Sequence, residues 1–137
     1  MINDSNQNSQ PRIMVVDDEK DILRIIKRDL ESNNQIRFNV DIFSTAESAL
    51  EAFENRPDNH YDLVLTDIRM PRMNGFELYR RIKEKNPATK VAFITAFEIN
   101  KEEFSKVLPS IDVKDFIIKP VSISALIIKL QEIIGHK

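Results

Sequence analysis

The sequence contains no cysteine, and its 137 residues include only two glycines and two histidines. Without cysteine, disulfides, thiolate nucleophiles and zinc–sulfur sites are excluded. The two histidines, His60 and His136, are far apart in the chain and lack metal-ligand spacing. Two glycines are too few for the glycine-rich loop that cradles phosphates in many nucleotide-binding proteins. Several common kinds of catalytic and cofactor site are therefore excluded at the outset.

The sequence also has no strong excess of one charge and no long apolar run. The formal net charge is −2, with acids and bases interspersed, which gives no reason to expect nucleic-acid binding. No apolar stretch approaches the length needed to span a membrane. The start of the chain, Met1 to Gln10, is polar and does not have the pattern of a secretory signal. We therefore expect a cytoplasmic protein with no membrane segment and no direct contact with nucleic acid.

Length and composition indicate one domain with one core. Apolar residues make up 42% of the chain and charged residues 31%, which is typical of a soluble globular protein. The first ten residues are rich in Asn, Gln and Ser and cannot bury apolar surface. We predict a disordered lead-in over residues 1–10 and a folded domain over residues 11–137.

Five short apolar runs predict five β-strands. The first is apolar at every position, which is typical of a parallel strand that is buried on both faces. The second alternates at period two, as a less buried strand does. The runs are Ile13–Val16, Phe38–Phe43, Leu63–Leu65, Val91–Ile94 and Phe116–Ile118.

Helical patterns follow each of these strands, with apolar residues at three- and four-residue spacing and charges between them. In the second pattern, Ser44 followed by Glu47 fits a capping box. The last pattern is more apolar than one buried stripe requires, and Ile128 lies off that stripe, so we expect it to be exposed. The patterns cover residues 22–30, 44–53, 76–82, about 99–108 and 122–134.

Strands that alternate with helices predict a doubly wound α/β fold. Right-handed crossovers then place helices on both faces of a parallel sheet, and ligands bind beyond the carboxyl ends of its strands. Polar side chains directly follow or end four of the predicted strands. These are Asp17, Asp18, Asp67, Thr95 and Lys119. We therefore expect them to meet at one edge of the sheet.

Three carboxylates and an ammonium at one place are suited to holding a divalent cation and moving a phosphoryl group. A carboxylate such as Asp67 can act as a nucleophile, and Lys119 suits a phosphoryl oxygen as a point charge. Clustered carboxylates repel one another unless a cation neutralises them, and Mg²⁺ prefers oxygen ligands. Taken singly, each residue has a simpler explanation as a helix cap, a turn residue, a strand-end hydroxyl or a surface lysine. All of these being incidental at once is improbable.

Five motifs occur in order along the chain. They are Val-Val-Asp-Asp-Glu at 15–19, Thr-Asp-Ile-Arg-Met-Pro at 66–71, Met-Asn-Gly at 73–75, Ile-Thr-Ala at 94–96 and Ile-Ile-Lys-Pro at 117–120. With these motifs the chain resembles the receiver domain of two-component response regulators, in particular the single-domain chemotaxis-type members. The resemblance implies a flavodoxin-like (βα)5 three-layer sandwich, with a five-stranded parallel sheet in the order 2-1-3-4-5.

The resemblance also implies a role for each acidic residue of the site. Asp67 would be the phosphoacceptor. Asp18, Asp67 and the backbone carbonyl of Arg69 would bind Mg²⁺ directly, and Asp17 would bind it through water. The implied cofactor is therefore Mg²⁺ alone.

The remaining motif residues would hold the phosphate and transmit its presence. By the same resemblance, Lys119 would pair with one phosphoryl oxygen and Thr95 would donate its hydroxyl to another. The bond between Lys119 and Pro120 would be cis. Phe116 stands at the position of the family's switch aromatic and would respond together with Thr95.

The implied function is a signalling switch rather than an enzyme with a diffusible product. The phosphoryl group would come from a sensor histidine kinase or a phosphotransfer protein. The responding surface would comprise the helix near residues 99–108, the strand at 116–118 and the last helix. A downstream protein or a second copy of the chain would bind there.

Two main alternatives stay open on the sequence. Haloacid-dehalogenase-type phosphatases also use a strand-end aspartate nucleophile with Mg²⁺, but they need a second aspartate two residues later, where this chain has Arg69. A receiver-like scaffold that is never phosphorylated would not require the full set of polar residues. A flavin- or nucleotide-binding domain is disfavoured because Asp17, Asp18 and Glu19 would repel a phosphate without a metal.

Overall fold

Five parallel strands form the centre of the protein in the computed structural model, which describes residues 10–96 and 116–135. Their order in the sheet is β2-β1-β3-β4-β5, as the resemblance implied, and every neighbouring pair is parallel. The strands are β1 (Arg12–Val16), β2 (Asn39–Phe43), β3 (Leu63–Thr66), β4 (Val91–Thr95) and β5 (Phe116–Ile118).

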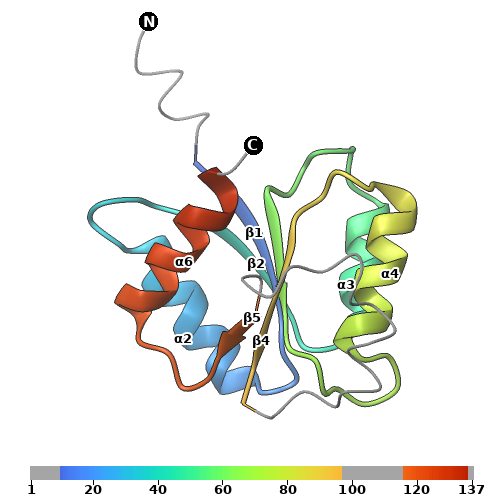
Figure 1. Ribbon diagram of the computed structural model, residues 1–137, viewed down its shortest axis with the longest axis horizontal. Coiled ribbons are helices and arrows are strands. Elements are labelled where there is room, and N and C mark those ends of the chain that lie inside the picture. The colour runs from blue at the N-terminus through green and yellow to red at the C-terminus, as the bar shows by residue number, and fades with distance from the viewer. Residues whose placement is uncertain (1–9, 97–115, 136–137) are drawn as a thin grey trace, which may run out of the picture.

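Four helices in the described part of the chain cover the two faces of this sheet. They are α2 (Lys20–Glu31), α3 (Ala46–Glu54), α4 (Gly75–Lys85) and α6 (Ile123–Gly135). In Figure 1, α2 and α6 lie on one side of the sheet and α3 and α4 on the other, which confirms the three-layer prediction. The helix predicted near residues 99–108 lies outside the described residues, as do residues 1–9 of the predicted lead-in. None of the described helices is long and apolar enough to cross a membrane.

The core has two halves because successive strand residues point to opposite faces of the sheet. Met14 and Val16 of β1 pack in the half under α3 and α4, whereas Ile13 and Val15 pack in the half under α2 and α6. All four side chains are fully buried. This explains why β1 is apolar at every position: both of its faces are covered by helices.

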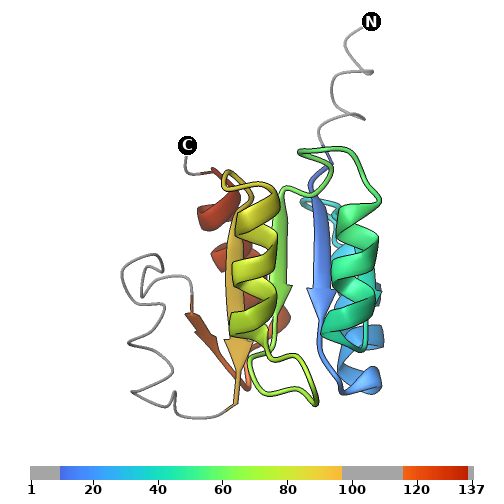
Figure 2. The same cartoon turned by 90° about the vertical axis from the view of Figure 1, so that its right-hand side faces the viewer.

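The parallel strands all run toward the same edge of the sheet. In Figure 2 the arrowheads of β1, β3 and β4 point the same way, with α3 and α4 side by side in front of them. The register pairs Val16 with Thr66 and Thr95 with Ile118, so these strands end close to one level. The residues that follow the strand ends are therefore brought near one another.

The start of α3 differs from the sequence prediction by one residue. The N-cap is Thr45, whose hydroxyl oxygen accepts from Ser48 N–H at 3.1 Å, so the predicted capping box of Ser44 with Glu47 is wrong. Two adjacent hydroxyl residues offer the same side-chain acceptor, and the backbone decides between them: Thr45 is extended and Ala46 is already helical. The expected exposure of Ile128 is confirmed, at 56%.

Candidate functional site

Four strands deliver polar residues to one edge of the sheet. Asp17 follows β1, Asp67 follows β3, Thr95 ends β4 and Lys119 follows β5. Asp67 N–H donates to Val16 O at 2.8 Å, and Lys119 N–H donates to Thr95 O at 2.8 Å. These bonds continue the parallel ladder past the strand ends, so the sheet itself fixes the backbone of the site.

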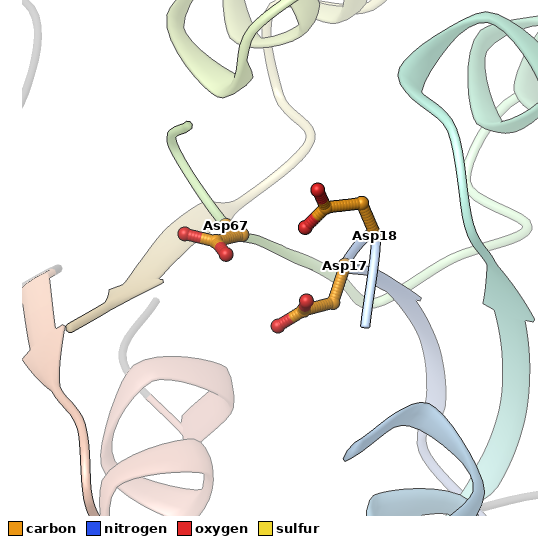
Figure 3. Close-up of side chains that lie close together, drawn as sticks. All are labelled: Asp17, Asp18 and Asp67. Atoms are coloured by element: carbon orange, nitrogen blue, oxygen red, sulfur yellow. The ribbon is translucent and has the colours of Figure 1, made fainter. Parts of the chain in front are cut away.

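Three carboxylates form the centre of the site. One oxygen from each of Asp17, Asp18 and Asp67 lies within 4.8 Å of the others, and Figure 3 shows the three side chains together. Asp17 and Asp67 are buried, whereas Asp18 is exposed. A set of carboxylate oxygens open to solvent on one side suits a hard cation such as Mg²⁺, which keeps several of its waters. The donor set therefore fits the expected metal.

The Lys119 ammonium group lies against this cluster. Lys119 Nζ donates to Asp17 Oδ2 at 2.7 Å and to Asp67 Oδ2 at 3.3 Å, and its side chain is only 12% exposed. Glu19 Oε1 lies 3.7 Å from the same nitrogen. The sequence places Glu19 in the first motif, but it does not reveal that the Glu19 carboxylate approaches Lys119. The bond between Lys119 and Pro120 is cis, as the resemblance implied.

Burial and charge together perturb the two central groups. The pKa of Asp67 is raised above its ordinary value, chiefly because burial disfavours the carboxylate and also because Asp17 repels it; Lys119 opposes the shift. Burial alone would lower the pKa of Lys119, but its hydrogen bond to Asp17 and the charges of Asp17 and Asp67 outweigh burial and raise it. The site thus holds the Lys119 ammonium firmly in its charged form beside Asp67, whose carboxyl group is costly to ionise.

Short-range hydrogen bonds fix the backbone around Asp67. Ile68 N–H donates to Asp67 Oδ1 at 2.7 Å, and the Thr66 hydroxyl donates to Asp67 O at 2.8 Å. Gly75 N–H, at the start of α4, donates to Ile68 O at 2.8 Å and closes the intervening loop at its base. The direction of the Asp67 carboxylate therefore depends on the peptide that follows it.

The loop that begins after Asp67 is also tied to α3. Arg72 adopts a left-handed backbone conformation, with φ of 66°, and its Nε donates to Glu47 Oε2 at 3.1 Å. Arg69 lies in the same loop and is exposed. The backbone that carries Arg69 is thus held at both ends of the loop and by one side chain in between.

The two expected switch residues lie on neighbouring strands. Thr95 is 1% exposed at the end of β4. Phe116 is half-buried, and its ring stacks on that of Phe93 with centroids 5.2 Å apart and planes inclined by 22°. Phe93 and Phe116 are register partners in β4 and β5. The Phe116 ring is therefore in contact with the strand that ends at Thr95.

An apolar groove of about 560 Å³ opens beside the charged site, between α2 and the segment that leads into α6. Glu19 and Lys119 belong to its lining, and Ile25, at 46% exposed, belongs to its wall. Further apolar lining comes from Ile22, Val121 and Ile123. The groove therefore has a charged end, formed by Glu19 and Lys119, and an apolar wall.

The family model of the response regulator receiver domain matches residues 13–131 of the sequence, a range that includes almost all of the described residues. The chain belongs to this family. The family assignment agrees with the strand order and with the charged residues found at the carboxyl edge of the sheet.

Relatives and solved structures support the same conclusion. The response regulator ArlR of Staphylococcus saprophyticus is 32% identical over 127 residues, which are 92% of this chain and 53% of ArlR. A CheY-like receiver domain of Methanospirillum hungatei is 31% identical, with a TM-score of 0.79 over 93% of this chain and 95% of that one. The response regulator TrrA of Thermotoga maritima, solved in complex with Mg²⁺ and BeF, is 27% identical, with a TM-score of 0.69 over 90% of this chain and 99% of that one. The receiver spans about half the length of ArlR.

Proposed function

We propose that this receiver domain is a phosphorylation switch whose phosphoacceptor is Asp67. The observation that carries the proposal is the buried Asp67 carboxylate, which faces Asp17, Asp18 and the Lys119 ammonium at one edge of the sheet. A buried carboxylate with two acidic neighbours and one cation is costly to assemble for stability alone. The same arrangement is suited to a phosphoryl group that carries negative charge.

In the proposed reaction, an Asp67 carboxylate oxygen attacks the phosphorus of a phosphohistidine. The new oxygen–phosphorus bond forms as the nitrogen–phosphorus bond breaks, and the electron pair of that bond leaves with the imidazole. Lys119 is within reach of Asp67 and would pair with an oxygen of the transferred group. Thr95 would donate its hydroxyl to another oxygen.

Asp18, Asp67 and the backbone carbonyl of Arg69 would hold Mg²⁺, with Asp17 acting through water. When bound, Mg²⁺ neutralises the carboxylates and the charge of the phosphoryl group. The protein's own contribution is to fix these oxygens at one place. Asp17 accepts from Glu19 N–H at 2.9 Å as well as from Lys119, so its direction is already set.

The phosphoryl group would act on the rest of the domain through Thr95 and Phe116. Movement of the Thr95 hydroxyl toward the phosphate changes the space at the end of β4, and Phe116 is in contact with that strand through Phe93. The surface that includes β5 and α6 would then change shape. Ile118 and Ile128, 58% and 56% exposed, are apolar residues on these two elements where a partner could bind.

The partners would be a sensor histidine kinase or phosphotransfer protein on the donor side and a protein target on the output side. A second copy of the chain is the alternative partner for the surface that includes β5 and α6, which would give a homodimer. On this proposal the protein assists only its own phosphorylation and dephosphorylation, so it is a switch in the cytoplasm rather than an enzyme.

The two alternatives make different demands on the site. A small-molecule phosphatase of the haloacid-dehalogenase type needs an aspartate at the position of Arg69. A scaffold that is never phosphorylated has no use for a buried acidic pair held against Lys119, which favours the phosphorylated switch.

Intact-mass measurement after incubation with Mg²⁺ and a small acyl phosphate or phosphoramidate tests the proposal. One phosphoryl adduct is expected on the wild-type protein, none on Asp67→Asn, and none after the metal is chelated. Asp58→Asn, at an exposed position away from the site, is the matched control and keeps the adduct. Wild-type protein that takes up no phosphate from any donor would support the scaffold instead.

A further inference from the structure

Gly75, the first residue of α4, stands where no side chain fits. A Cβ added there would lie 2.2 Å from Asp67 O, 3.0 Å from Asp67 C and 3.0 Å from Ile68 Cα. All three atoms belong to the backbone, so they cannot swing aside as the end of a long side chain can. The backbone of Gly75 is not left-handed. The glycine is therefore required for space and not for an unusual φ angle.

Two hydrogen bonds connect Gly75 to the Asp67 carboxylate through Ile68. Gly75 N–H donates to Ile68 O at 2.8 Å, and Ile68 N–H donates to Asp67 Oδ1 at 2.7 Å. On its other side, Asp67 N–H donates to Val16 O at 2.8 Å. The first turn of α4 and the edge of β1 thus hold the Asp67 peptides from both sides, and the carboxylate takes its direction from them.

The start of α4 is fixed by a separate contact within the helix itself. Asn74 Oδ1 accepts from Glu77 N–H at 2.9 Å and caps the helix, so α4 begins at Gly75 regardless of Asp67. A side chain at position 75 therefore cannot be accommodated by unwinding the helix without loss of this cap. The remaining response is a displacement of the peptide between Asp67 and Ile68.

We propose that Gly75 is a positioning residue for the metal and phosphoryl site. Because Gly75 has no side chain, α4 can pack directly against the peptide between Asp67 and Ile68, and this peptide orients the Asp67 carboxylate. The inference rests on the proposed function of Asp67 and extends it to a residue that touches neither metal nor phosphate. Any side chain at position 75 turns the carboxylate away from Asp17 and Asp18 and weakens metal binding before it affects the rest of the fold.

Gly75→Ala tests this inference, and the chain offers a matched control. Gly135, the other glycine, also lies in a helix, and a Cβ there would meet nothing within 4 Å. Binding of Mn²⁺ is followed by the paramagnetic broadening of assigned amide resonances, and phosphate uptake by intact mass. Gly75→Ala should lose about 10- to 100-fold in Mn²⁺ affinity and in phosphorylation rate, as changes in residues that support metal ligands commonly do. Gly135→Ala should match the wild type in both.

The outcomes separate this inference from the proposed function. If wild-type protein takes up phosphate and folded Gly75→Ala does so equally well, with the same Mn²⁺ affinity, the positioning role is wrong. If wild-type protein takes up no phosphate but Gly75→Ala binds Mn²⁺ more weakly, the positioning role stands and the proposed function fails.

A measurement on the wild-type protein covers the case in which Gly75→Ala does not fold. The Gly75 amide resonance should shift, and its hydrogen exchange should slow, on addition of Mg²⁺ with beryllofluoride, because its partner Ile68 O becomes fixed with Asp67. The Gly135 amide should show neither change. A Gly75 amide that responds no more than that of Gly135 would overturn the proposal.

Discussion

Lys119 Nζ lies 2.7 Å from Asp17 Oδ2 and 3.3 Å from Asp67 Oδ2, so one ammonium bridges two buried carboxylates. The shorter contact is with Asp17, which is expected to bind the metal through water, and not with Asp67, the proposed phosphoacceptor and direct metal ligand. The Lys119 ammonium thus neutralises carboxylates that a bound divalent cation would also neutralise. Binding of metal and contact between Lys119 and Asp17 should therefore oppose each other.

Lys119→Met should bind Mg²⁺ more tightly than the wild type and be less stable without it. Loss of the ammonium leaves Asp17 and Asp67 uncompensated, which should lower the free energy of unfolding by about 3 kcal/mol in the absence of metal. Mg²⁺ should restore part of this loss, because it binds the native state and neutralises the same carboxylates. Urea denaturation with and without Mg²⁺, together with metal titration, measures both effects.

Lys20→Met is a suitable control for this comparison, because Lys20 is exposed at the start of α2. It should change neither the metal affinity nor the response of stability to Mg²⁺. Unchanged or weaker Mg²⁺ binding by Lys119→Met would mean that the ammonium and the metal do not compete.

Asp67→Asn should stabilise the metal-free protein at neutral pH. The pKa of Asp67 is raised in the folded protein above its ordinary value of 3.8, mainly by burial. Between these two pKa values the folded state binds more protons than the unfolded state, so ionising Asp67 lowers the free energy of unfolding as the pH rises. The side chain introduced by Asp67→Asn does not ionise, so the free energy of unfolding of the variant does not fall for this reason.

The difference between wild type and Asp67→Asn should therefore grow as the pH rises through the folded pKa of Asp67 and level off above it. Urea denaturation in the presence of a chelator, over a series of pH values, measures it. Addition of Mg²⁺ should reverse the order, because only the wild type keeps the full set of carboxylates. A difference that is independent of pH would show that burial of the Asp67 charge does not limit stability.

The positions of the strands and the meeting of the charged residues could be predicted because both follow from short-range patterns. Val91 to Ile94 is apolar at every position, and a parallel strand buried on both faces requires this. Once the strands are parallel, Asp17 and Asp67 must come to the same edge. The sequence was sufficient here because topology, and not side-chain detail, decides the outcome.

Three details could not be predicted, because each depends on distances within a few ångströms. Whether Lys119 lies closer to Asp17 or to Asp67 is decided by the packing of one flexible side chain. The need for glycine at position 75 appears only when α4 is placed against Asp67 O. The choice of Thr45 over Ser44 as N-cap depends on the backbone conformation at the end of β2.

Phe116 should change its environment when the site is filled. A fluorine label on phenylalanine, with the Phe116 resonance assigned through Phe116→Leu, should report a shift on addition of Mg²⁺ and beryllofluoride. The physical reason is that the Phe116 ring stacks on Phe93 of β4, the strand that ends at Thr95. In Thr95→Ala the shift should be lost although the mimic still binds.

Phe38 provides the internal control, because it is buried under α2 in the other half of the core. Its resonance should not move with the mimic. An unshifted Phe116 resonance in the wild type would count against the switch, and a shift that persists in Thr95→Ala would remove Thr95 from the path.

Tyr61 and Asp41 form a partly buried contact that the sequence does not reveal, since it joins a residue two positions before β3 to the middle of the edge strand β2. Tyr61 Oη donates to Asp41 Oδ2 at 2.6 Å. Burial, followed by this hydrogen bond and the charge of Asp41, raises the pKa of Tyr61 to about 12. Tyr61→Phe should lower the free energy of unfolding by about 1 kcal/mol at neutral pH, because a hydrogen bond to a charged acceptor is lost.

The pH dependence of this loss follows from the raised pKa of Tyr61. A group whose pKa is higher in the folded state contributes its full stability below the unfolded value of 10.0, and the contribution disappears as the pH rises toward about 12. The gap between wild type and Tyr61→Phe should therefore be constant at neutral pH and shrink above pH 10. Urea denaturation measures this gap in the free energy of unfolding. A double-mutant cycle of Tyr61→Phe, Asp41→Asn and the variant with both changes isolates the interaction energy between Tyr61 and Asp41. A gap that stays constant into the alkaline range would mean that the Tyr61 hydroxyl contributes through packing and not through its proton.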